Sequence, residues 1–136
     1  MKRIKVLRIK PHCVPEIVRI PLGLESLQKE VGGTIQVTYP WDDPVALICN
    51  EEGKLLGFGI DNFNRTLLTD DGTPIDFIAG TFLITGLTED DFGSLSPELL
   101  AKYEKMFHCP ERFWRTIDEH GRTHLKIDYE PENTVK

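Results

Sequence analysis

The chain has 136 residues, of which 40% are hydrophobic and 28% are charged, with a formal net charge of −6. This composition suits one folded domain, and no apolar run approaches the roughly 20 residues that a membrane span needs. Three widely spaced cysteines and a basic N-terminus without a continuous apolar block predict a cytoplasmic protein with reduced thiols, neither exported nor bound to a membrane.

Most of the chain predicts β-strands joined in hairpins. The strand segments alternate apolar and polar residues, or are continuously apolar where both faces are to be buried, and turn residues separate them. The expected strands cover residues 3–9, 16–20, 34–40, 45–49, 75–86, 111–118 and 123–130. The connections at 50–53 and 69–73 have the composition of hairpin turns, in which the glutamates of the first turn point to water.

Two segments predict helices. Apolar side chains share one helical face in residues 24–31, and Gly32 ends this helix. The longer helix covers 97–107, where Ser96 is a suitable cap and Pro97 suits the first position. The predicted fold class is therefore α+β: a single domain, mainly an antiparallel sheet of hairpins, with a short N-terminal helix and one longer amphipathic helix.

The negative charge is concentrated in the middle of the sequence. Residues 61–100 contain one basic and eight acidic side chains, a net of −7. Proteins bind nucleic acid chiefly by replacing its counterions with Lys and Arg, so we expect no direct nucleic-acid binding. The simplest interpretation of the acidic segment is a set of solvated turns that keep the protein soluble.

The one basic residue of this segment, Arg65, follows Asn64 and has two interpretations. As a structural residue it would pair with nearby carboxylates, which contributes about 1 kcal/mol when the pair is exposed. As a binding residue, its guanidinium and the neighbouring amide could hold a phosphate or a carboxylate. The candidate ligand- or partner-binding residues are Asn64, Arg65, Asp76 and the aromatic residues Trp41, Phe58 and Phe63.

Histidine and cysteine are adjacent at 12–13 and again at 108–109. Both are zinc ligands, but adjacent residues of an extended chain point to opposite faces, whereas zinc knuckles separate their paired ligands. We therefore expect no metal and no other cofactor, with buried thiols beside surface imidazoles. The sequence also lacks a nucleophile elbow and a phosphate-binding glycine loop, so we predict no catalytic residues.

Several motifs occur in a characteristic order: NEEGKLLG, the Asn-Arg pair, DDGTPIDFIAGTFLITG and DDFGSLSPELLAKYEKMF. Together they resemble a family of small proteins from phages, plasmids and bacterial mobile elements that is known as a domain of unknown function. The resemblance covers about residues 1–113, and residues 114–136 form a C-terminal hairpin or appendage. The segment GFGIDNFNR departs from the family pattern, which usually has a proline-rich step before the Asn-Arg pair.

The resemblance implies no known reaction. Small proteins of phages and conjugative elements often counter host immunity, so we expect a non-enzymatic binding protein in a bacterial host cell. It would inhibit a host defence protein or sequester a nucleotide signal. Two alternatives stay open: a small enzyme that acts on a nucleotide or peptide through the acidic region 61–91, and a structural accessory that forms a homo-oligomer through a sheet edge.

Overall fold

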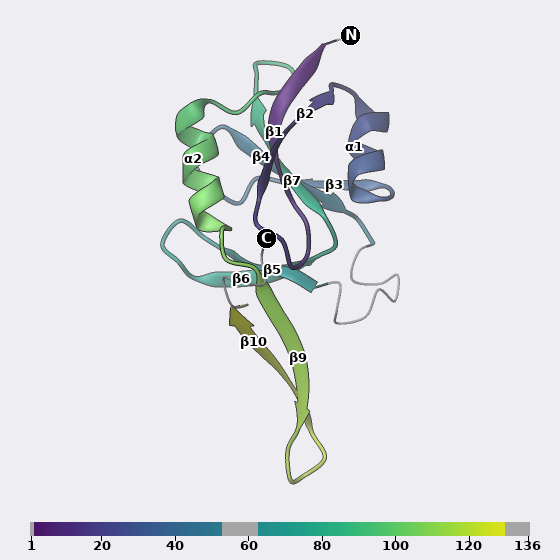
Figure 1. Ribbon diagram of the computed structural model, residues 1–136, viewed down its shortest axis with the longest axis vertical. Coiled ribbons are helices and arrows are strands. Elements are labelled where there is room, and N and C mark those ends of the chain that lie inside the picture. The colour runs from purple at the N-terminus through teal and green to yellow at the C-terminus, as the bar shows by residue number, and fades with distance from the viewer. Residues whose placement is uncertain (1, 53–62, 130–136) are drawn as a thin grey trace.

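The computed structural model describes residues 2–52 and 63–129, which contain ten strands and two helices (Figure 1). The strands are β1 (Arg3–Ile9), β2 (Glu16–Pro21), β3 (Ile35–Thr38), β4 (Val45–Asn50), β5 (Phe63–Leu68), β6 (Pro74–Ala79), β7 (Phe82–Leu87), β8 (Phe92–Gly93), β9 (Glu111–Ile117) and β10 (Thr123–Tyr129). The helices are α1 (Leu24–Val31) and α2 (Pro97–Met106). Antiparallel strands dominate, and the predicted α+β character with two helices is confirmed.

The strands form three antiparallel sheets instead of one. The largest has the order β2-β1-β7-β4-β3, and β8 pairs with β7 beside this path. A second sheet is the β5–β6 hairpin, and a third is the β9–β10 hairpin. The first predicted hairpin is present as β1 and β2, with Val6 opposite Val18.

The prediction of a single strand at 75–86 is wrong. That run is divided between β6 and β7, which belong to different sheets. The chain turns at Gly80, whose φ of +80° lies in the left-handed region that glycine adopts without a steric penalty. Apolar content alone did not reveal the division because Ile78 and Ala79 before the turn and Phe82 and Leu83 after it are all buried.

The large sheet has a hydrophobic core on each face. Ile4 and Val6 of β1 point to the face that packs against α1, while Leu7 and Ile9 point to the face that packs against α2. Figure 1 shows the two helices on opposite sides of this sheet. Strands buried on both faces need no polar residues, which explains the continuous apolar run of β4.

Local chemistry sets the ends of both helices. Gly32 follows α1 with a φ of +83° and donates its N–H to the Gln28 carbonyl. At the start of α2, the Ser96 hydroxyl oxygen accepts the Leu99 N–H at 3.3 Å. These are the predicted stop and the predicted cap.

A polar cluster fixes α2 to the loop between β3 and β4. Asp43 Oδ2 accepts hydrogen bonds from Lys102 Nζ at 2.5 Å and from the Tyr103 hydroxyl at 2.7 Å. The Lys102 hydrogen bond, followed by that of Tyr103, lowers the pKa of Asp43. The carboxylate therefore stays charged, and it joins the loop to the buried face of α2.

The β9–β10 hairpin projects from the body of the protein (Figure 1). Its two strands pair over seven residues, from Glu111 opposite Tyr129 to Ile117 opposite Thr123. At its base Phe113 packs edge-on against Phe63 of β5, with 5.5 Å between ring centroids. Neither helix of the described residues has the length and apolarity that crossing a membrane requires.

Candidate functional site

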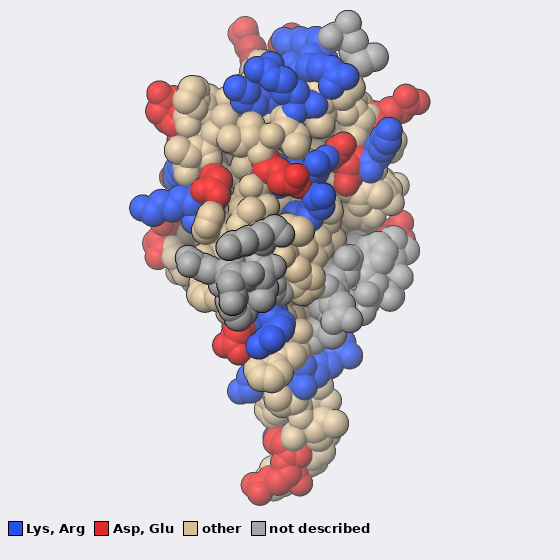
Figure 2. Space-filling model, in the orientation of Figure 1, with Lys and Arg blue, Asp and Glu red and all other residues tan. Residues whose placement is uncertain are grey.

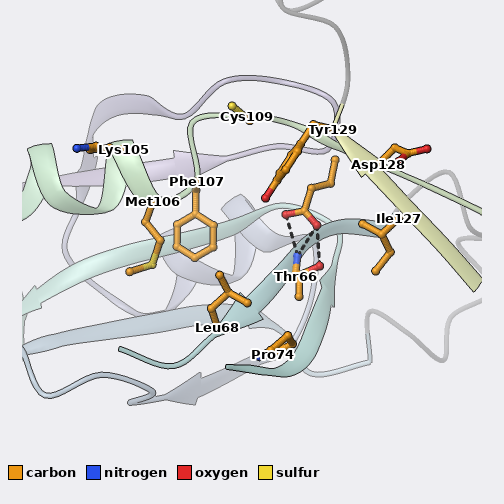
Figure 3. Close-up of a pocket in the computed structure, with 11 residues that line it drawn as sticks. Thr66, Leu68, Pro74, Lys105, Met106, Phe107, Cys109, Ile127, Asp128 and Tyr129 are labelled. Atoms are coloured by element: carbon orange, nitrogen blue, oxygen red, sulfur yellow. Dashed lines mark hydrogen bonds between the residues drawn. The ribbon is translucent and has the colours of Figure 1, made fainter. Parts of the chain in front are cut away.

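A pocket of about 720 Å³ lies between the β5–β6 hairpin, the end of α2 and the base of the β9–β10 hairpin (Figure 3). Its lining is mostly apolar or aromatic, from Leu68, Pro74, Met106, Phe107, Ile127 and Tyr129. Its polar groups come from Thr66, Lys105, Cys109, Glu111 and Asp128. A concave, mostly apolar space with a few polar groups is the usual form of a binding pocket.

The polar centre of the pocket is the carboxylate of Glu111. It accepts the Thr66 backbone N–H through both oxygens, at 3.0 and 3.1 Å, and the Thr66 hydroxyl at 2.6 Å (Figure 3). These bonds attach the first residue of β9 to β5, in the place of ordinary strand pairing. Glu111 is only 7% exposed, so the hydrogen bonds are shielded from water.

Burial raises the pKa of Glu111 above its ordinary value of 4.5, because desolvation disfavours the charged carboxylate. The hydrogen bonds from Thr66 oppose this effect, as does the positive charge of Arg65. The pocket therefore contains a carboxyl group that takes up a proton more readily than an exposed glutamate.

Replacing Glu111 with Gln is expected to change how stability depends on pH. Because the folded state raises the pKa of Glu111, the wild-type free energy of unfolding decreases as pH rises from about 4.5 through the folded pKa. Glutamine can still accept a hydrogen bond from Thr66 but does not ionise, so the variant loses this decrease. Urea unfolding of both proteins between about pH 4 and pH 8 measures the difference, and parallel curves would contradict the assignment.

A β-bulge explains why two consecutive polar residues of β5 are both buried. Phe63 pairs with Ala79 and Arg65 pairs with Ile78, so Asn64 is an extra residue on its strand. In a regular strand neighbouring side chains point to opposite faces, but a bulge turns two of them the same way. Asn64 and Arg65 are both 0% exposed as a result.

The guanidinium of Arg65 binds backbone carbonyls from distant segments. Nε donates to the Phe107 carbonyl at 3.0 Å, and Nη2 donates to the Cys13 carbonyl at 2.6 Å. Nη1 donates to the Asn64 side-chain oxygen at 2.8 Å. Arg65 therefore connects the end of α2, the loop after β1 and its own strand.

Asn64 completes this arrangement. Its amide nitrogen donates to the Ile9 carbonyl at 2.9 Å and to the Gly80 carbonyl at 2.8 Å. The pair thereby satisfies buried carbonyls at the end of β1 and at the turn between β6 and β7. This geometry favours the structural interpretation of Asn64 and Arg65, because both side chains bind backbone carbonyls of other segments.

Arg65 also brings the two His-Cys segments near one another, since it binds Cys13 and the residue before His108. The expectation of buried thiols is wrong: Cys13 and Cys109 are exposed, and Cys49 is half-buried. In residues 2–52 and 63–129, no three His, Cys, Asp or Glu side chains gather as a metal site.

The other candidate residues lie in different places. Trp41 is 5% exposed, donates its indole N–H to the Leu68 carbonyl at 2.9 Å and packs in the core. Phe63 is half-buried at the base of the hairpin, and Asp76 is exposed in β6 beside a separate pocket of about 330 Å³. Phe58 lies outside the described residues, as does Gly53 of the first predicted turn.

The acidic residues of the middle segment are distributed over several elements. Asp70 and Asp71 lie in the turn after β5, Asp76 lies in β6, and residues 89–91 lie between β7 and β8. On the face shown in Figure 2, acidic side chains are scattered among basic and neutral ones. On this face the acidic side chains therefore do not form one continuous acidic surface.

Sequence reasoning missed Glu111 and the pocket. The sequence does contain a signal for Glu111. Glu111 and Phe113 are two residues apart in β9, so their side chains lie on the same face of the strand, and this face packs against the body of the protein. The pocket itself depends on contacts between segments far apart in the sequence, and no local motif indicates it.

Comparisons with known proteins concern mainly the part of the chain before β9. A model of a domain of unknown function, DUF3846, matches residues 4–108, which include β1 to α2. Comparison with curated proteins and with solved structures gives no match. The pocket thus lies where the family domain meets the C-terminal hairpin. Because the match covers well over half of the 136 residues, the chain belongs to the DUF3846 family.

Proposed function

We propose that this is a non-enzymatic binding protein whose recognition site is the pocket between β5–β6, α2 and the β9–β10 hairpin. The observation that carries the proposal is the combination of an apolar lining with the buried carboxylate of Glu111. The occupant is an apolar or aromatic side chain of a partner protein, on a segment that also has a hydrogen-bond donor or a basic group.

The charge of the lining favours a protein segment over a nucleotide. Among the described lining residues, Glu111 and Asp128 are acidic and Lys105 is basic. A phosphate would meet more negative than positive charge there, whereas a Lys, Arg or amide group would be attracted. Of the two expected modes of action, occupation of a protein is therefore better supported than capture of a nucleotide signal.

The identity of the partner rests on the family resemblance. Small proteins of phages, plasmids and mobile elements often act against host immunity, and on this ground our proposal takes the partner to be a host defence protein. An exposed aromatic residue at the rim, Tyr129, is of the type that contributes strongly at protein interfaces. The scattered carboxylates of residues 70–91 give no comparable support to the enzyme alternative.

A random peptide library displayed on phage tests the proposal with the full-length protein as bait. Selected peptides should contain an aromatic or large apolar residue close to a basic or amide residue. Tyr129→Ser should weaken their binding about tenfold or more, the loss typical of a strong interface residue. The matched control is Tyr39→Ser, since Tyr39 is also exposed, at 61%, but lies outside the pocket.

Three results would overturn the proposal. The first is a selection that returns no peptide above background, and the second is a set of peptides that binds Tyr129→Ser and Tyr39→Ser equally well. The third is a nucleotide, found by screening a panel, that binds specifically and displaces the selected peptides. This result would assign the pocket to a small molecule.

A further inference from the structure

The outer edge of β10 is an unpaired sheet edge in the described part of the chain. β10 pairs there with β9 alone, through seven consecutive pairs without a bulge, and all seven of its residues are exposed. Edge strands in natural proteins are commonly protected by bulges, prolines, short length or charged residues, and of these β10 has only the charged residues Lys126 and Asp128. A two-stranded hairpin is also marginally stable alone in water.

The side chains of β10 divide into an apolar row and a charged row. Leu125, Ile127 and Tyr129 share one face and are 41%, 43% and 71% exposed. Lys126 and Asp128 alternate with them and point to the other face. An exposed edge with an ordered apolar row is suited to pairing with another strand.

We propose that a second copy of this chain pairs with this edge, β10 against β10, antiparallel about a two-fold axis at Ile127. A two-fold axis places residues that are equally distant before and after it opposite one another. Lys126 of each copy then lies opposite Asp128 of the second copy, and Leu125 lies opposite Tyr129. The Lys126–Asp128 pair and the Leu125–Tyr129 pair are each formed twice, and Ile127 lies opposite Ile127 of the second copy.

The position of the axis follows from charge complementarity. An axis at Lys126 would place two ammonium groups opposite one another, and an axis at Asp128 would do the same with two carboxylates. An axis at Leu125 would place Lys126 opposite His124. Within β10, only the axis at Ile127 joins Lys126 to a carboxylate, and opposite charges across a strand pair are favourable while like charges are not.

The dimer has a four-stranded antiparallel sheet with the order β9-β10-β10-β9. In each chain Asp128 is already opposite Arg112 of β9, so it would lie between two basic residues. Lys126 is opposite Trp114, whose ring also lies 5.6 Å from the Arg112 guanidinium carbon. Pairing therefore extends one charged face and one apolar face across both copies.

Sedimentation equilibrium of the full chain tests the proposal. Between about 1 and 500 µM, wild-type protein should shift from the monomer mass of 15.5 kDa towards twice that mass. Lys126→Glu places Glu opposite Asp128 twice, and Asp128→Lys places Lys opposite Lys126 twice. Each variant alone should dimerise about tenfold or more weakly than wild type.

A mixture of the two variants provides the decisive control. In the mixed dimer, each introduced charge faces an opposite charge, so an equimolar mixture should recover the dimer that neither variant forms alone. Both positions are exposed, and circular dichroism checks that the variants are folded. A wild-type chain that stays at 15.5 kDa, or a mixture that stays monomeric, overturns the proposal.

Discussion

Arg65→Met is expected to lower the free energy of unfolding by about 4 kcal/mol. The methionine fills much of the same space but leaves the carbonyls of Cys13 and Phe107 and the side-chain oxygen of Asn64 without their donor. A buried acceptor without a partner costs about 1–3 kcal/mol. The free energy of unfolding of a single domain is about 5–15 kcal/mol, so the variant should lose a large share of the wild-type stability.

Urea unfolding followed by tryptophan fluorescence measures this effect, because Trp41 is buried in the folded protein. Arg112→Met is the matched control: Arg112 is exposed, and its removal should change stability by less than about 1 kcal/mol. A loss of less than about 1 kcal/mol in Arg65→Met would contradict the structural role. Peptide binding by the folded fraction should stay unchanged, whereas selective loss of binding would restore Arg65 as a candidate binding residue.

Gly86→Ala is expected to destabilise the protein by about 3 kcal/mol. A Cβ at Gly86 of β7 would lie 2.3 Å from the carbonyl oxygen of Ser94 and 2.9 Å from its carbonyl carbon. Both atoms belong to backbone, so β8 and the segment after it must move. That segment includes Leu95, whose N–H donates to the Lys5 carbonyl, so the movement reaches the main sheet.

The control for this prediction is Gly121→Ala in the hairpin tip. A Cβ there meets nothing within 4 Å, and its cost comes only from a φ of +78°, about 1–2 kcal/mol. The two variants thus separate steric crowding from backbone preference. Equal losses in thermal or urea unfolding would show that the contact between β7 and Ser94 is not the cause.

The sequence predicted features that depend on neighbouring residues. Gly32 marks the end of α1, Ser96 marks the start of α2, and the turn at 69–73 joins β5 to β6. In each case the residue that decides the structure lies within a few positions of its effect. The antiparallel character of the fold follows from such local turns.

The features that were not predictable join distant parts of the chain. The bulge at Asn64 makes a buried pair out of residues that would point apart in a regular strand. Arg65 finds its acceptors 42 and 52 positions away, and Glu111 binds Thr66 across 45 positions. No property of one segment specifies its partner at such separations, so the pocket and its polar centre required the three-dimensional arrangement.

The position of β1 between β2 and β7 in the large sheet constrains how the chain is made. Leu7 pairs with Ile84, and Arg65 needs the carbonyl of Phe107, so neither contact exists until late in synthesis. Translation adds about 5–20 residues per second, which leaves the first hairpin without its neighbour for several seconds. During that interval the apolar side chains on both faces of β1 are open to chaperones on the ribosome, and slower translation would lengthen the exposure.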